Sequence, residues 1–209
     1  MTRQEFATVK RLWKAMFAIS AFRSAIAAID LIVREKMDGN DKVYNALIAA
    51  VFTQYARPFT ANNGVGPLNP KIIPKHLRPL HGQLMTFRHQ MFAHSNPKAF
   101  KIDRLGPVIQ AWFNFDANGG MANWTTGISF SVQKIMALKG CLEEILTAVL
   151  KEYSALIESL KQHTPSAFGD YVLNVYDADR PVWIRHSEAK QLLPADAIEL
   201  KIVKQPSDR

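Results

Sequence analysis

The order of hydrophobic and polar residues along the chain predicts a mainly helical protein. Apolar residues recur every three or four positions in five segments: 4–18, 20–37, 42–57, 79–97 and 132–163. In the third segment we expect Val43, Leu47, Val51 and Tyr55 to form the buried stripe. Successive helices of this length are typical of an up-and-down helical bundle.

Residues that start and stop helices mark the expected boundaries. Ser20 can cap a second helix, which would place a tight corner between it and the first, and Gly39 would end it. Asn40 or Asp41 can cap the third helix. Pro79 suits the first turn of the fourth, because its missing N–H costs nothing there.

The pattern changes after Pro97 to short β-branched and aromatic segments. Residues 107–115 and 124–132 read as a hairpin around the turn residues 116–123, or as extended arms that cross the bundle. Three further short strands are expected at 171–176, 182–186 and 198–203. We therefore expect two units. Residues 1–163 form the bundle with an extended insertion at 107–132, and residues 164–209 form a small β appendage on the bundle or on a second subunit.

Composition narrows the class of protein. The chain has 209 residues, of which 48% are hydrophobic and 21% charged, as in a globular domain. No apolar leader follows Met1, and the nearly uncharged apolar run 43–56 is too short to span a bilayer. The single cysteine, Cys141, excludes a disulfide framework within one chain and a cysteine zinc cluster. We expect a cytoplasmic protein without membrane contact, and its net charge of +8 favours polyanionic partners.

Two polar residues in segment 79–97 have the chemistry required for RNA cleavage. Arg88 is a permanent cation that can hold a phosphate through two hydrogen bonds. His94 titrates near neutral pH and can move a proton to or from a ribose or leaving oxygen. This division of roles needs no metal or other cofactor. Carboxylates that could bind a metal are absent from the sequence between Asp41 and Asp103.

The sequence RHQMFAHSN that begins at Arg88 resembles the R-x4–6-H motif of the HEPN family. That family consists of helical-bundle proteins and includes many metal-independent ribonucleases. The resemblance assigns the motif arginine to Arg88, the histidine to His94 and the polar neighbour of the arginine to His89. It is most specific over residues 55–97, and it implies a homodimer with a composite site, RNA as substrate, and a toxin or defence role with a cognate antitoxin.

Spacing alone does not establish the motif. Arg180 and His186 have the same separation, but Pro181 and an extended, aromatic context surround them. Arg88 and His94 also have a plain structural interpretation, as a solvated arginine and a histidine favoured by the helix C-terminus.

Further polar residues can support the site or contact RNA: His89, Arg57, Asn62, Asn63, His81, Ser95 and Asn96. Arg57 precedes Pro58 in an aromatic turn, where it can either contact phosphate or hold the loop by bonding carbonyl groups. His81 can extend the polar face of the helix or be an ordinary first-turn surface residue. The basic loop 64–78 can track a nucleic-acid strand or be a solvated loop.

Helix geometry adds one constraint. On an ideal helix Arg88 and His94 point about 120° apart, so one helix does not close a compact site around a phosphate. Two copies facing each other across a two-fold axis can do so. The sequence therefore predicts a metal-independent endoribonuclease that acts as a homodimer. The alternative is a non-catalytic HEPN-like module that binds a nucleotide or a protein.

Overall fold

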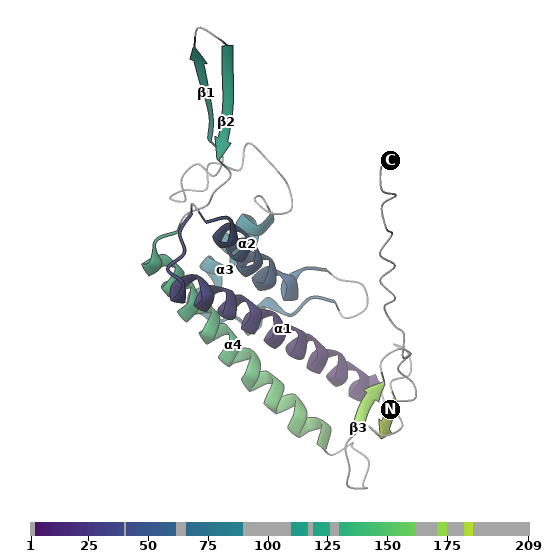
Figure 1. Ribbon diagram of the computed structural model, residues 1–209. Coiled ribbons are helices and arrows are strands. Elements are labelled where there is room, and N and C mark those ends of the chain that lie inside the picture. Colours follow the sequence, from purple (N-terminus) through teal and green to yellow (C-terminus); the bar gives the residue numbers. More distant parts are fainter. Residues whose placement is uncertain are drawn as a thin grey trace, which may run out of the picture.

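The computed structural model describes residues 3–39, 41–61, 66–89, 110–116, 119–125, 130–161, 171–174 and 182–185. The fold is mainly α, with four helices packed together (Figure 1). These helices are α1 (Arg3–Arg34), α2 (Lys42–Ala56), α3 (Arg78–Arg88) and α4 (Val132–Lys161). Single 3-10 turns form η1 (Arg57–Phe59), η2 (Pro70–Ile72) and η3 (Lys75–Leu77).

The two longest helices, α1 and α4, lie side by side and run in opposite directions (Figure 1). An ion pair of 3.0 Å joins Arg11, near the start of α1, to Glu152, near the end of α4. A second ion pair joins Asp30 at the end of α1 to Lys139 near the start of α4. These exposed pairs contribute little free energy of folding, but together they define the antiparallel register.

The predicted corner at Ser20 is wrong, because α1 is one uninterrupted helix of 32 residues. No proline or glycine lies in it. The Ser24 hydroxyl donates to the Ser20 carbonyl at 3.0 Å, one turn back, so both serines are accommodated within the helix. Ala21, Ala25 and Ala28 are buried, and small residues at such positions permit close helix packing, whereas Ala27 is exposed.

The end of α1 at Arg34 also differs from the prediction, which continued the helix to about Met37 and assigned its termination to Gly39. Lys36 takes a left-handed backbone conformation, with φ of 51°. The Met37 N–H donates to the Ile32 carbonyl at 3.0 Å and the Lys36 N–H to the Val33 carbonyl at 3.2 Å. This pair of bonds is a Schellman motif with a lysine where glycine is usual. The helix therefore ends before Gly39.

Replacing Lys36 by glycine is expected to raise the free energy of unfolding by about 0.5–1 kcal/mol. The left-handed conformation costs a side-chain-bearing residue ~1–2 kcal/mol, whereas glycine loses ~0.5–1 kcal/mol of extra backbone entropy on folding. Urea denaturation measures the difference. Lys151→Gly is the matched control, because Lys151 is an exposed lysine inside α4 and its replacement should destabilise by ~1 kcal/mol. Equal effects of the two substitutions would contradict this account.

Helix α2 begins as predicted, with the Asp41 side chain accepting from the Val43 N–H at 2.7 Å. Its buried stripe is shifted by one residue at this end. Val43 is 51% exposed, whereas Tyr44 is buried and its hydroxyl accepts from the Phe130 N–H at 2.8 Å. The predicted Val51 and Tyr55 are buried.

Aromatic side chains join α1, α2, η1 and α3 in the core. The Phe22 ring lies 6.0 Å from the rings of both Tyr55 and Phe59. About one turn earlier on α2, the Phe52 ring lies 4.4 Å from that of Phe87 near the end of α3. Because Tyr55 at the end of α2 contacts His81 near the start of α3, α2 and α3 are antiparallel.

The described part of the predicted basic loop ahead of α3, from residue 66 onward, contains short helical turns. These turns are η2 and η3. The Arg78 guanidinium donates to the carbonyls of Ile73 and Lys71, at 3.3 Å in each case. Leu68 donates its N–H to the Pro58 carbonyl at 2.7 Å and is buried. These bonds fix the approach to α3, which begins one residue before Pro79.

In the described residues, four strands form two antiparallel pairs. In the first, β1 (Gln110–Asp116) pairs with β2 (Gly119–Thr125), so that Asp116 lies opposite Gly119. The predicted turn over 116–123 is thus too long, because Gly119 and Gly120 belong to the strand rather than to the turn. In the second, β3 (Tyr171–Asn174) pairs with β4 (Val182–Arg185). The predicted strand 198–203 lies outside the described residues.

Helix α1 is long and apolar enough to cross a membrane, which the sequence analysis did not predict. By length and composition, residues Ala7–Arg34 could cross a membrane. The side chains responsible include Ala18, Phe22, Ala25 and Ile29, and all four are buried in the core. A core helix passes the same test, so this observation is weak evidence for a membrane span.

Candidate functional site

Arg88 is the last residue of α3, the helix that carries the motif arginine. Its side chain is half-buried on the flank of the helix, next to the fully buried Phe87. Within the described part of the chain no hydrogen bond or ion pair engages the Arg88 guanidinium. His89 follows as the cap residue, is exposed, and donates its backbone N–H to the carbonyls of Met85 and Thr86.

Several predicted site residues lie outside the described residues. They are His94, Ser95 and Asn96 after α3, and Asn62 and Asn63 after η1. Their placement relative to Arg88 therefore stays a prediction.

Arg57 is held by an aromatic ring. Its guanidinium carbon lies 4.6 Å from the centre of the Phe17 ring on α1, which is a cation–π contact. The two alternatives from the sequence were phosphate contact and bonding of loop carbonyls. The observed stacking is a third arrangement, and it leaves the side chain exposed at the end of α2. Pro58 is buried beside it, so the turn itself is ordered as expected.

His81 lies in the first turn of α3 but is half-buried, so it is not an ordinary surface residue. Its Nδ1 lies 2.8 Å from the Tyr55 hydroxyl oxygen, and its ring packs edge-on against Phe59 at 4.6 Å. Burial lowers the pKa of His81 and raises that of Tyr55. A neutral His81 can therefore accept the hydrogen bond of the Tyr55 hydroxyl. The imidazole faces the turn at η1 rather than solvent, because Tyr55 and Phe59 occupy that side of α3.

This burial predicts a specific pH dependence of stability. Because the pKa of His81 is lower in the folded than in the unfolded chain, the unfolded chain binds the proton more readily. The free energy of unfolding should therefore fall as the pH drops below about 6.5, the ordinary pKa of histidine. The loss should level off below the pKa of the folded state.

Urea titrations at several pH values between 5 and 8 can measure this effect. His81→Gln, which keeps a polar partner for Tyr55, should remove this contribution to the slope. His76→Gln changes an exposed histidine that pairs with Glu144 and should leave the His81 contribution in place. A slope unchanged in His81→Gln would show that other groups cause it.

The structure brings together a basic groove that was not predicted from the sequence. It has a volume of about 460 Å³ and lies between α1, the residues around η2, and α4. Arg11 and Lys14 come from α1 and Lys71 from η2, whereas Glu152 is the only carboxylate in the described lining. The Lys14 side chain passes beside Gly66, whose φ is 74°.

A sequence signal for this groove did exist. Arg11 and Lys14 are three positions apart, so they share one face of the first helix. The basic loop 64–78, which contains Lys71, is also evident in the sequence. What sequence could not show is that these two positive segments meet. Pro67, Leu68 and Ile72 add apolar surface to the groove.

The described regions contain no evident metal-binding site. No group of three or more histidine, cysteine, aspartate or glutamate side chains there could hold a metal ion. The site residues that the structure describes are cationic or aromatic, and such groups suit a negatively charged substrate.

Comparisons of this chain with known protein families, with curated proteins and with solved structures found no match.

Proposed function

We propose that this protein is a HEPN-like, metal-independent endoribonuclease that acts as a homodimer. The observation that carries the proposal is Arg88. It is a half-buried guanidinium at the end of α3 that no described side chain neutralises, and His94 follows it at the motif spacing. A partly desolvated arginine without a carboxylate partner favours a bound phosphate. The packed four-helix core is compatible with a bundle of this family.

The proposed reaction needs one proton acceptor and one cation. His94 removes the proton from a ribose 2′-hydroxyl, and the 2′-oxygen forms a bond to the adjacent phosphorus. The bond from phosphorus to the 5′-oxygen breaks, and that oxygen takes up a proton from solvent water as it leaves. Arg88 stabilises the negative charge that develops on the phosphoryl oxygens. The products are a 2′,3′-cyclic phosphate and a 5′-hydroxyl.

A second copy of the chain would complete the site. Arg88 ends α3, and on a continuing helix His94 would point about 120° away from it. Two α3 ends related by a two-fold axis would supply two arginines and two histidines around one phosphate.

The basic groove is the proposed path for the RNA backbone. Arg11, Lys14 and Lys71 supply three positive charges against the single carboxylate of Glu152. Arg11 is already paired with Glu152 at 3.0 Å, so Lys14 and Lys71 are the cations available for phosphate. Binding should accordingly weaken as the salt concentration rises.

The direct test is incubation of the purified protein with total RNA in excess EDTA, beside His94→Ala. The wild type should cleave the RNA and leave 2′,3′-cyclic phosphate ends, whereas the variant should not. Substrates with 2′-deoxyribose should resist cleavage, because the attacking oxygen is missing. A need for divalent ions, or full activity of His94→Ala, would reject the mechanism. A role as toxin with a cognate antitoxin, or in defence, would follow from such activity.

A non-catalytic binding module is the second candidate, and the basic groove is the observation that favours it. A volume of about 460 Å³ lined by cations and apolar side chains falls within the usual range for small-molecule sites. Nucleotide binding that requires Lys14 and Lys71, without any RNA cleavage, would support this alternative.

A further inference from the structure

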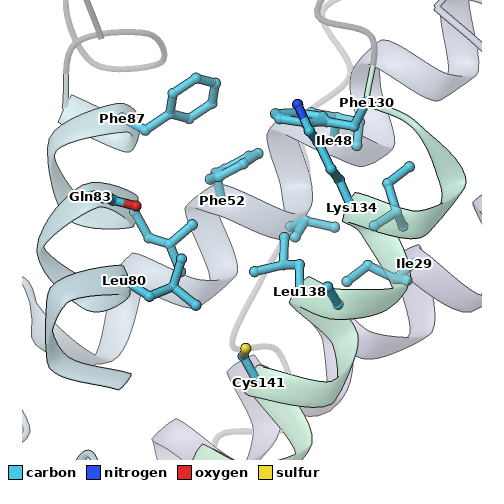
Figure 2. Close-up of a pocket in the computed structure, with 14 residues that line it drawn as sticks. Ile29, Ile48, Phe52, Leu80, Gln83, Phe87, Phe130, Lys134, Leu138 and Cys141 are labelled. Carbon is cyan, nitrogen blue, oxygen red and sulfur yellow. The ribbon is translucent and has the colours of Figure 1, made fainter. Parts of the chain in front are cut away.

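An apolar cavity lies between α2, α3 and α4, apart from the basic groove (Figure 2). Its volume is about 240 Å³. The walls include Phe52 from α2, Leu84 and Phe87 from α3, and Leu138 from α4. No buried polar or charged side chain occurs in the described core, so the interior of this cavity offers water nothing to bind.

The polar groups of the lining are few, and the two largest are exposed. Gln83 projects from α3 and Lys134 from α4, on opposite sides of the cavity (Figure 2). In the described regions neither the Gln83 amide nor the Lys134 ammonium group has a hydrogen-bond or ion-pair partner. An unpaired cation beside an apolar cavity complements a ligand with a hydrocarbon body and an anionic head.

The volume sets the size of the hydrocarbon body. A dry apolar cavity of about 150 Å³ accepts benzene, and sites for drug-sized ligands start at about 300 Å³. A cavity of 240 Å³ therefore suits about ten non-hydrogen atoms, by proportion to benzene. A straight-chain carboxylate with eight carbons has this size and is flexible enough to follow the walls.

We propose that this cavity is a binding site for medium-chain carboxylates, with the chain against Phe52, Phe87 and Leu138 and the carboxylate at Lys134. Filling the cavity restores dispersion contacts that its walls lack when it is empty. The ammonium group of Lys134 selects the acid over an uncharged or cationic amphiphile of the same length. This inference does not depend on the proposed nuclease activity, and nothing in it requires Arg88.

The single cysteine of the chain provides a probe inside this site. Cys141 lines the cavity and is partly exposed. Burial, and secondarily the charge of Glu144, raises the pKa of its thiol, so labelling by a maleimide should be slow near neutral pH and faster in mildly alkaline buffer. Because the chain contains no other cysteine, mass spectrometry of the intact protein reports on this position alone.

The experiment measures the rate of maleimide labelling at pH 8.5 with octanoate, octylammonium or no additive. Octanoate should slow labelling several-fold at saturation, and octylammonium should protect much less. Lys134→Gln should weaken the apparent octanoate affinity about three- to fivefold, as expected for an exposed ion pair. Lys151→Gln, which changes another exposed lysine of α4, should leave the affinity unchanged.

The Ala137→Phe variant provides a second test of the site, one that changes no charged group. Ala137 lines the cavity and is exposed, so a larger side chain there should occlude the site without burying a polar group. Octanoate protection should then be lost while the thermal transition remains cooperative. The proposal is overturned if octanoate does not protect wild-type Cys141, or if octylammonium protects equally well. Retained protection in Ala137→Phe would also place the ligand elsewhere. Because labelling needs no RNA, its failure is separable from failure of the nuclease proposal.

Discussion

Substituting Arg88 by alanine is expected to lower the rate of RNA cleavage by about 10²–10³-fold, the range seen when one charge-stabilising donor is removed from an active site. The free energy of unfolding should change by less than about 0.5 kcal/mol, since no described hydrogen bond or ion pair is lost. Arg88→Lys should recover only part of the rate, because an ammonium group lacks the planar fork that holds two phosphoryl oxygens. Single-turnover cleavage of a defined RNA measures all three rates.

Arg34→Ala is the matched control for this substitution. Arg34 is also the last residue of its helix, α1, and its exposed guanidinium pairs only with the neighbouring Glu35 among the described contacts. The Arg34→Ala variant should cleave RNA at the wild-type rate. If Arg34→Ala and Arg88→Ala lose activity equally, the loss reflects net charge and RNA binding rather than catalysis. Full activity of Arg88→Ala would remove this residue from the mechanism.

Helix boundaries could be predicted wherever the signal is local. Asp41 caps α2 because its carboxylate can reach the Val43 N–H two residues on, and sequence shows that possibility directly. The α4 segment was predicted to within two residues because its apolar seam continues for eight turns. Ser20 was different, since serine is tolerated both at a cap and inside a helix. Only the packing of α1 along α4 decides between the two.

Which residue at the start of α2 faces the core could not be predicted in the same way. Val43 and Tyr44 are adjacent, and both are acceptable in a buried stripe. Tyr44 is inside because its hydroxyl meets the Phe130 N–H, 86 positions away in sequence. A contact of this separation has no local pattern.

The same limit applies to the site. Arg88 could be singled out from spacing and context, although the predicted helix 79–97 placed it mid-helix whereas α3 ends at this residue. The partial burial of His81 could not be predicted from the sequence, because its partner Tyr55 is 26 positions away. The basic groove combines Arg11 with Glu152, which are separated by 141 positions. Sequence identifies chemical groups, whereas tertiary packing decides which of them meet.

Phe22→Ala is expected to be the most destabilising single substitution, lowering the free energy of unfolding by about 3–5 kcal/mol. Phe22 is fully buried at 0% exposure and contacts the rings of Tyr55 and Phe59. Its removal leaves a cavity where α1, α2 and η1 meet, and tight packing on three sides limits how far they can collapse into it. Calorimetry should record a transition lower by roughly 6–20 °C for a chain of this size.

Met16→Ala is the control on the same helix, because Met16 is 49% exposed and its truncation should cost less than about 0.5 kcal/mol. The Phe22 variant should also weaken the pH dependence assigned to His81. The ring of His81 packs against Tyr55 and Phe59, and both lose their support from α1. Looser packing admits water to the imidazole and moves its pKa back toward the ordinary value. A Phe22 variant that is destabilised but keeps the full His81 slope would show that His81 is desolvated by α3 and η1 alone.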